Sequence, residues 1–175
     1  MYIPFLITIQ YAISSNSKQV SSIQLHTIPN VFCNLLITEV FYLLSWIYLE
    51  SSDEITFKSV AGFMLTYEVL YYFTHLAFHK FDTLKILHVQ KHAYLDAFYA
   101  WNCHKADHII INIMPFAISH IVFRLNSYIL LLAIILNIEI TIRSCKLYSY
   151  YQIHHGNQNK RYGYFYLLDR LLNTY

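Results

Sequence analysis

The sequence has little of what turn-rich, disulfide-stabilised or nucleic-acid-binding proteins need. Glycine and proline number three each among 175 residues, which disfavours a β-rich fold with many tight turns. Only 13% of the residues are charged, against roughly 25% in typical soluble domains. The three cysteines form no C-x-x-C motif, and their odd number argues against a disulfide framework. A net charge of +2 is too small to indicate nucleic acid as a partner.

Apolar and aromatic residues fill the chain instead. It is 57% hydrophobic and contains 17 tyrosines and 12 phenylalanines, a composition typical of membrane proteins with aromatic belts at the two interfaces. A helix needs about 20 apolar residues to cross a bilayer. Three stretches approach or exceed that length, residues 31–49, 57–78 and 109–142, the last interrupted at 124–127. They predict an all-α integral-membrane bundle with two helical hairpins.

The remaining segments set the predicted domains and orientation. Residues 2–13 are apolar but short, so 1–30 is predicted to be an interfacial or marginal membrane segment and 31–175 the membrane domain. Most of the basic residues lie in two polar regions, one between the second and third apolar stretches and one after the third. The positive-inside rule places both regions in the cytosol, where they would form a helical cap.

Histidine is the most informative residue of this cap. Three pairs are each four residues apart, a spacing that places two side chains on one helix face, and a fourth cluster follows near the C-terminus. Imidazole is the commonest metal-binding side chain, and several imidazoles without cysteine suit iron, zinc or copper. The topology brings both cytosolic regions to one side of the membrane. The candidate metal ligands are His75, His79, His88, His92, His104, His108, His154 and His155.

Carboxylates near these histidines have candidate supporting roles. Glu68 lies inside the second apolar stretch, where a buried acid is costly and therefore often functional. It is expected either to orient a histidine or to form a structural hydrogen bond with a tyrosine. Asp107 and Asp96 are further candidates for orienting a histidine ring.

Together these elements resemble the fatty acid hydroxylase / sterol desaturase superfamily of integral-membrane di-iron oxidases. That family carries H-x-x-x-H, H-x-x-H-H, H-P-x-E and a final H-x-x-H-H, followed by an N-Y-G and L-D-R-L-x-G-T ending. The resemblance covers about residues 31 to 175. The matching elements are Glu68 leading into His75 and His79, His88 with His92, His104 with His108, His154-His155, Tyr162-Gly163 and Leu168-Asp169-Arg170-Leu171.

The resemblance implies a chemistry. Two irons would activate dioxygen and attack a C–H bond of a lipid, either a sterol or a fatty acyl chain, to hydroxylate or desaturate it. Electrons would come from NAD(P)H through a b-type cytochrome or a reductase. The expected location is the endoplasmic reticulum, with the histidines facing the cytosol.

Departures from the family pattern leave two other hypotheses open. Lys91 stands where the middle histidine of the second motif belongs, Tyr151 begins the last motif, and Arg143 lies where a further histidine-containing element is usual. Protonated lysine and arginine have no lone pair to offer a metal, whereas Tyr151 could bind iron as a phenolate. One alternative is therefore a degenerate, catalytically impaired member with a lipid-binding or partner role. The other, a histidine-lined metal transporter, does not explain the closing motif.

Overall fold

The computed structural model describes residues 22–48, 56–92, 101–126, 128–129, 131–133, 135, 154 and 159–174. Helices are the only regular elements within these ranges, which confirms the all-α prediction. In chain order they are α2 (Ser22–Tyr48), α3 (Phe57–Lys80), α4 (Asp82–His88), the 3₁₀ helix η1 (Val89–His92), α5 (Lys105–Asp107), the π-helical η3 (His108–Ile113), α6 (Met114–Phe123) and α9 (Leu167–Leu171).

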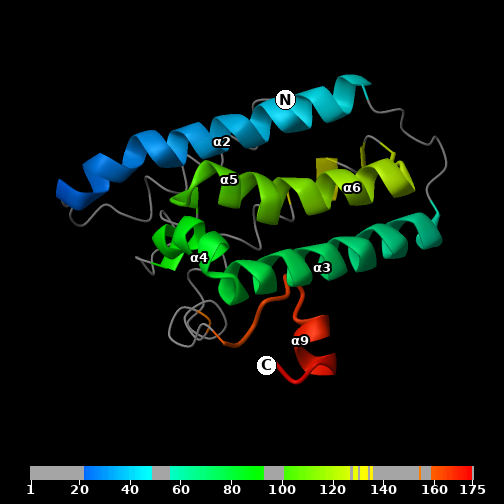
Figure 1. The fold of residues 1–175 in the computed structure, drawn as a ribbon. Helices are drawn as coiled ribbons and strands as arrows, with labels where there is room; N and C mark the ends of the chain where they lie inside the picture. Colours follow the sequence, from blue (N-terminus) through cyan, green and yellow to red (C-terminus); the bar gives the residue numbers. More distant parts are fainter. Residues whose placement is uncertain are drawn as a thin grey trace.

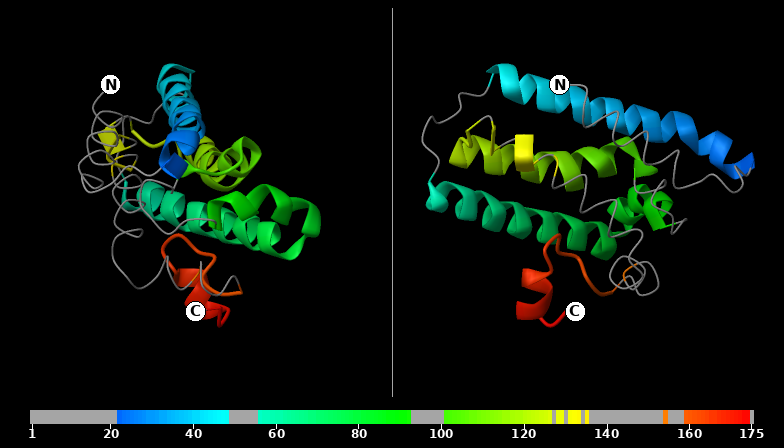
Figure 2. Two further views of the ribbon diagram at one scale, coloured as in Figure 1. Left: turned by 90° about the vertical axis from the view of Figure 1, so that its left-hand side faces the viewer. Right: turned by 180° about the vertical axis from the view of Figure 1, so that it is seen from behind.

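Three long helical segments pack side by side. The continuous segment formed by α5, η3 and α6 lies between α2 and α3 and runs antiparallel to α3 (Figure 1). Short helices α4 and η1 cover the end of α3, and α9 packs on the side of α3 that faces away from α2 (Figure 2). The end of α3, the short helices and the start of the α5–α6 segment therefore meet at one end of the bundle.

Two of these segments are long and apolar enough to cross a membrane, Thr27–Ser45 in α2 and Lys105–Phe123 in α5–α6. The helix α3 has the length but not the hydropathy of these two segments, so its predicted span, and with it the count of two hairpins, stays a prediction. Along α2 an apolar residue is exposed at every fourth position, which forms one outward stripe: Ile28, Phe32, Leu36, Val40 and Leu44. A lipid environment would cover such a stripe.

Local chemistry sets the ends of the helices. A capping box between Thr56 and Ser59 begins α3, and extended backbone at Phe81 ends it. Arg124 adopts a left-handed conformation (φ 43°) and ends α6, which confirms the predicted interruption at 124–127. The helix before this break extends beyond the apolar stretch at its start. The helix begins at Lys105 rather than Ile109, because His104 caps it by accepting a hydrogen bond from the Ala106 amide.

The core lies between α3 and α6. Phe63 and Tyr67 of α3 pack edge-on against Phe116 of α6, with ring centroids 5.2 and 6.1 Å apart. Gly62 permits the close approach of the two helices, because a Cβ added there would collide with the ring of Phe123. The aromatic packing therefore fixes α3 in position, and with it the histidines at its end.

Several predictions concern residues outside the described ranges. These are the marginal segment at 2–13 and the candidate residues Asp96, Arg143, Tyr151 and His155. The predicted domain boundary after residue 30 falls inside α2, which continues through it without a break.

Candidate metal centre

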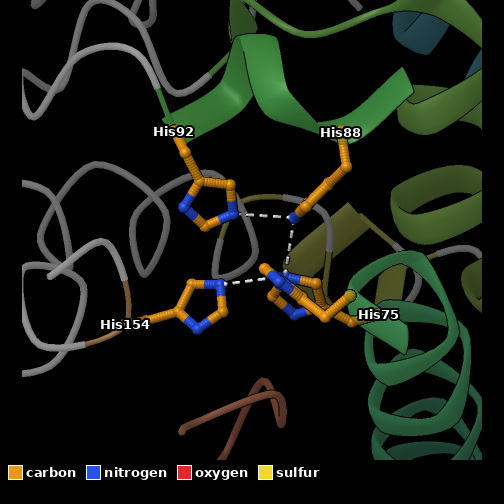
Figure 3. Close-up of side chains that lie close together, drawn as sticks. His75, His88, His92 and His154 are labelled. Carbon is orange, nitrogen blue, oxygen red and sulfur yellow. Dashed lines mark hydrogen bonds between the residues drawn. The ribbon is translucent and has the colours of Figure 1, made fainter. Parts of the chain in front are cut away.

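Five histidines converge at the end of the bundle. Their candidate ligand nitrogens all lie within 4.8 Å of one another. They come from α3, α4, η1 and the segment around residue 154, and Figure 3 shows four of the rings directed at a common centre. The five are His75, His79, His88, His92 and His154.

The helices place these rings by simple geometry. His75 and His79 are one turn apart on α3, so both face the same side. The extended residue Phe81 then turns the chain, and α4 packs back against α3 so that its last residue, His88, lies opposite His75. One turn of η1 adds His92 beside His88. The H-x-x-x-H spacing thus produces a shared face in each case.

The Nε2 atoms of these rings approach one another closely. His75 Nε2 is 3.2 Å from His88 Nε2, and His92 Nε2 is 2.9 Å from the same atom. The Nε2 atoms of His79 and His154 are 3.1 Å apart. Nitrogen ligands at about 2.0–2.1 Å from one ion are themselves about 3 Å apart. The separations match those of ligands in a single coordination sphere.

The opposite ring nitrogens fix which Nε2 atoms carry lone pairs. His75 Nδ1 lies 2.9 Å from the Tyr162 carbonyl oxygen, and His88 Nδ1 lies 2.8 Å from Asp107 Oδ1. His154 Nδ1 lies 2.6 Å from the Lys160 carbonyl oxygen. These oxygens accept hydrogen bonds, so each Nδ1 carries the proton and each neutral ring presents a bare Nε2.

Two such lone pairs therefore face each other between His75 and His88 with no proton between them. Burial lowers the pKa of His88, although its bond to Asp107 works in the opposite direction, and burial lowers the pKa of His154 to about 4. Burial thus favours the neutral form of His88, and a proton shared with His75 across this contact is disfavoured. A metal cation among the Nε2 atoms would accept both lone pairs and remove the repulsion between them.

Asp107 has the position expected of a carboxylate that orients a ligand. It is fully buried, and its Oδ1 holds the Nδ1–H of His88. Carboxylate partners of this kind fix the tautomer of a metal-binding histidine and increase its basicity. The geometry agrees with the orienting role predicted for Asp107.

The third predicted pair, His104 and His108, does not join the cluster. His104 is exposed and caps α5, as described above. His108 is buried, but its Nε2 lies 2.7 Å from Thr38 Oγ1 of α2 and its Nδ1 lies 3.3 Å from the Asn112 amide nitrogen. Both ring nitrogens of His108 are thus occupied by neighbours on the α2 side. The structure therefore does not bring this pair to the cluster, and both residues make contacts within or between helices instead.

Glu68 differs from both roles expected of it. Its hydrogen bonds to the described residues go to backbone amides, not to a histidine ring or a tyrosine hydroxyl. Oε2 accepts from the Phe165 amide (2.6 Å) and Oε1 from the Leu167 amide (3.0 Å). Glu68 thereby ties the C-terminal segment to α3, where the orphan amides at the start of a short helix need an acceptor.

The closing motif of the sequence also has a supporting role. The buried Asp169 accepts from the backbone amides of Tyr162 and Gly163, both at 2.7 Å, and from the Thr174 hydroxyl at 2.8 Å. A Cβ on Gly163 would lie 2.5 Å from Glu68 Oε1 and 2.7 Å from Asp169 Oδ2, so only glycine fits between the two carboxylates. The motif holds the Tyr162 carbonyl that binds His75.

Sequence reasoning missed the polar face of α2. Asn34 donates to the carbonyl oxygens of Trp101 and Cys103, both at 2.8 Å, and Thr38 binds His108. In the sequence Asn30, Asn34 and Thr38 are spaced four apart within an apolar stretch. That spacing was the available signal, because polar residues on one face of an apolar helix need partners.

An apolar cavity of about 200 Å³ lies along α3 from the cluster. The face of α3 that leads to it carries a ring at every fourth residue: Phe63, Tyr67, Tyr71, His75 and His79. Tyr67 lines the cavity, Tyr71 packs 5.8 Å from Tyr67, and His75 packs 5.5 Å from Tyr71. The cavity walls are Val60, Phe63, Met64, Tyr67, Phe116, Leu125, Ile129, Leu132, Ala133, Tyr164 and Phe165.

No family model matches the chain, and neither a curated protein nor a solved structure is significantly similar to it. The site therefore rests on its own geometry, a cluster of five histidines that could hold a metal ion.

Proposed function

We propose that the chain is a membrane-embedded, iron-dependent oxidase of lipid C–H bonds, a divergent relative of the fatty acid hydroxylase / sterol desaturase superfamily. One observation carries the proposal: five histidine ligand nitrogens lie within 4.8 Å of one another, and the lone pairs of His75 and His88 face each other. Five imidazoles exceed the four ligands of a tetrahedral zinc site, which favours an ion with a higher coordination number such as iron. Bound iron would supply dioxygen activation.

The protein would contribute position and an apolar surrounding. Asp107 and the carbonyls of Tyr162 and Lys160 hold three of the rings in one tautomer, so the site is organised before a metal enters. The apolar cavity beside Tyr67 is proposed to bind the hydrocarbon of a sterol or acyl chain, with Tyr71 between it and the histidines.

The reaction requires an external electron donor. Hydroxylation takes one oxygen atom of O₂ into a C–H bond and reduces the other to water with two electrons and two protons. Desaturation removes two hydrogens from the lipid and reduces O₂ to two waters with the same input. We propose a b-type cytochrome or NAD(P)H-dependent reductase as the donor at the cytosolic face of the endoplasmic reticulum.

The test combines metal and product analysis. The full chain would be purified in detergent, loaded anaerobically with Fe²⁺, and supplied with lipid extract, an NADPH-driven reductase system and O₂. We expect bound iron and a lipid that has gained an oxygen atom or lost two hydrogens, with neither in the His79→Ala variant. Iron that is absent from the purified chain after loading would contradict the proposal.

A catalytically impaired, metal-binding relative is the second candidate. The observation that favours it is Lys91, which is 7% exposed and lies between His88 and His92 on the short helices. A buried positive charge beside the cluster opposes the loss of electrons from a bound cation. Bound iron without any O₂-dependent lipid product in the same assay would favour this second function.

A further inference from the structure

The size of the histidine cluster decides how many ions it can enclose. In two-metal sites the ions lie about 3.5–4 Å apart, and each nitrogen ligand adds about 2 Å at its own end. Ligands on opposite ions are therefore separated by up to about 8 Å. The five ligand nitrogens here, one from each histidine, all lie within 4.8 Å of one another, close to the spread of ligands around a single ion.

The described residues do not provide a second set of ligands. No other group of three or more metal-ligating side chains is found among them. His108, another of the predicted ligands, already uses both ring nitrogens in contacts with Thr38 and Asn112. Of the ten histidines, His155 alone remains as an unplaced candidate from the predicted set.

A buried positive charge lies next to the cluster. Lys91 is buried, at 7% exposure, and it lies on η1 directly before the cluster residue His92 and three residues after His88. Asp107 Oδ2 has no hydrogen-bond partner among the described residues, so this buried carboxylate needs a nearby positive charge.

We propose that the centre holds one metal ion, with the Lys91 ammonium in place of the second. The proposal rests on the function proposed above, and it departs from the two irons that the family resemblance implies. A single ion uses one nitrogen from each of the five histidines, and the buried Lys91 supplies the second positive charge.

Stoichiometry tests the proposal directly. The full chain in detergent would be incubated anaerobically with excess Co²⁺ or Fe²⁺, desalted, and analysed by mass spectrometry of the metal. We expect one ion per chain, and an electron paramagnetic resonance signal of high-spin Co²⁺ that accounts for all the bound cobalt. Two ions per chain, or a signal reduced by coupling between two cobalts, would overturn the single-ion proposal and leave the proposed metal-dependent function intact. No bound ion would overturn both.

Variants of Lys91 test its part. Lys91→Gln removes the charge, so the single ion should bind about tenfold more tightly because the repulsion between two cations is gone. Lys91→Arg keeps the charge and should bind Co²⁺ as the unaltered chain does. A Co²⁺ affinity that is equal in both variants would show that the Lys91 charge does not act on the ion and would overturn this part.

Discussion

His88/His92 and His104/His108 have identical spacing, H-x-x-x-H, yet the structure uses them differently. The first pair lies on α4 and η1, which fold back against the end of α3, and both Nε2 atoms meet the other histidines. The second pair lies at the start of the α5–α6 segment, where one ring caps a helix and the other binds α2. Spacing puts two rings on one face, but the neighbouring helix decides what that face meets.

The supports behind the rings differ in the same way. The Nδ1 of His88 donates to a carboxylate, which leaves its Nε2 bare and directed at other lone pairs. The two nitrogens of His108 are both held by neutral groups, Thr38 and Asn112, so no unsatisfied lone pair remains to attract a cation. A metal-binding histidine is therefore distinguished from a structural one by what its second nitrogen contacts.

Replacing one histidine from each pair should give the largest contrast. His88→Ala removes a ligand and leaves Asp107 buried without its partner. Loss of a residue that only hydrogen-bonds a ligand lowers metal affinity about 10–100-fold, so loss of the ligand itself should lower it by more than about 100-fold. The free energy of unfolding should fall by about 3 kcal/mol. Titration with Co²⁺ against a competing chelator measures the affinity, and thermal unfolding in detergent measures stability.

The matched variants come from the other pair. His108→Ala loses two hydrogen bonds and should cost about 1 kcal/mol for each, without a change in metal affinity. His104→Ala removes the cap of α5 and should cost about 1 kcal/mol of stability, again without a change in metal affinity. Loss of metal from His108→Ala to the same degree as from His88→Ala would break the distinction between the pairs.

The sequence alone predicted much of this arrangement, but not which of the histidine pairs would join the cluster. Composition and apolar stretches predicted an all-helical fold, and the break at Arg124 was located correctly. The spacing of the histidines predicted the shared faces of the pairs on α3 and on α4–η1. It could not predict that Thr38 would bind His108 or that Glu68 would bind backbone amides, because those contacts depend on how helices distant in sequence pack.

A smaller effect on metal affinity is expected from replacing Asp107, the carboxylate that binds His88 and has no counterpart at His108. Asp107→Asn keeps an oxygen that can accept from His88 Nδ1 but removes the negative charge. Metal affinity should fall about 10–100-fold while the number of bound ions stays unchanged. Asp82→Asn, an exposed carboxylate at the start of α4, is the matched control and should bind metal normally. Equal affinities in the two variants would mean that the Asp107 charge does not support the centre.

The smallest effect should come from Glu68, which reaches the cluster only through the C-terminal segment. In Glu68→Gln the side-chain NH₂ group replaces one of the two oxygens that accept from the Phe165 and Leu167 amides. Two N–H donors then face each other without an acceptor, which should lower the free energy of unfolding by about 1–3 kcal/mol. The segment that carries the Tyr162 carbonyl loosens, and His75 loses part of its support. Metal affinity should then fall less than about tenfold, below the range for direct supporting partners.

Amide hydrogen exchange separates this indirect effect from general destabilisation. In Glu68→Gln the Phe165 and Leu167 amides should exchange faster, whereas the backbone amides of α2 should keep their rates. Glu39→Gln makes the same chemical change on α2, on the other side of the bundle from α9, and should leave the exchange of residues 162–167 as it is (Figure 1). Unchanged exchange at Phe165 and Leu167 in Glu68→Gln would show that Glu68 does not hold the segment that positions His75.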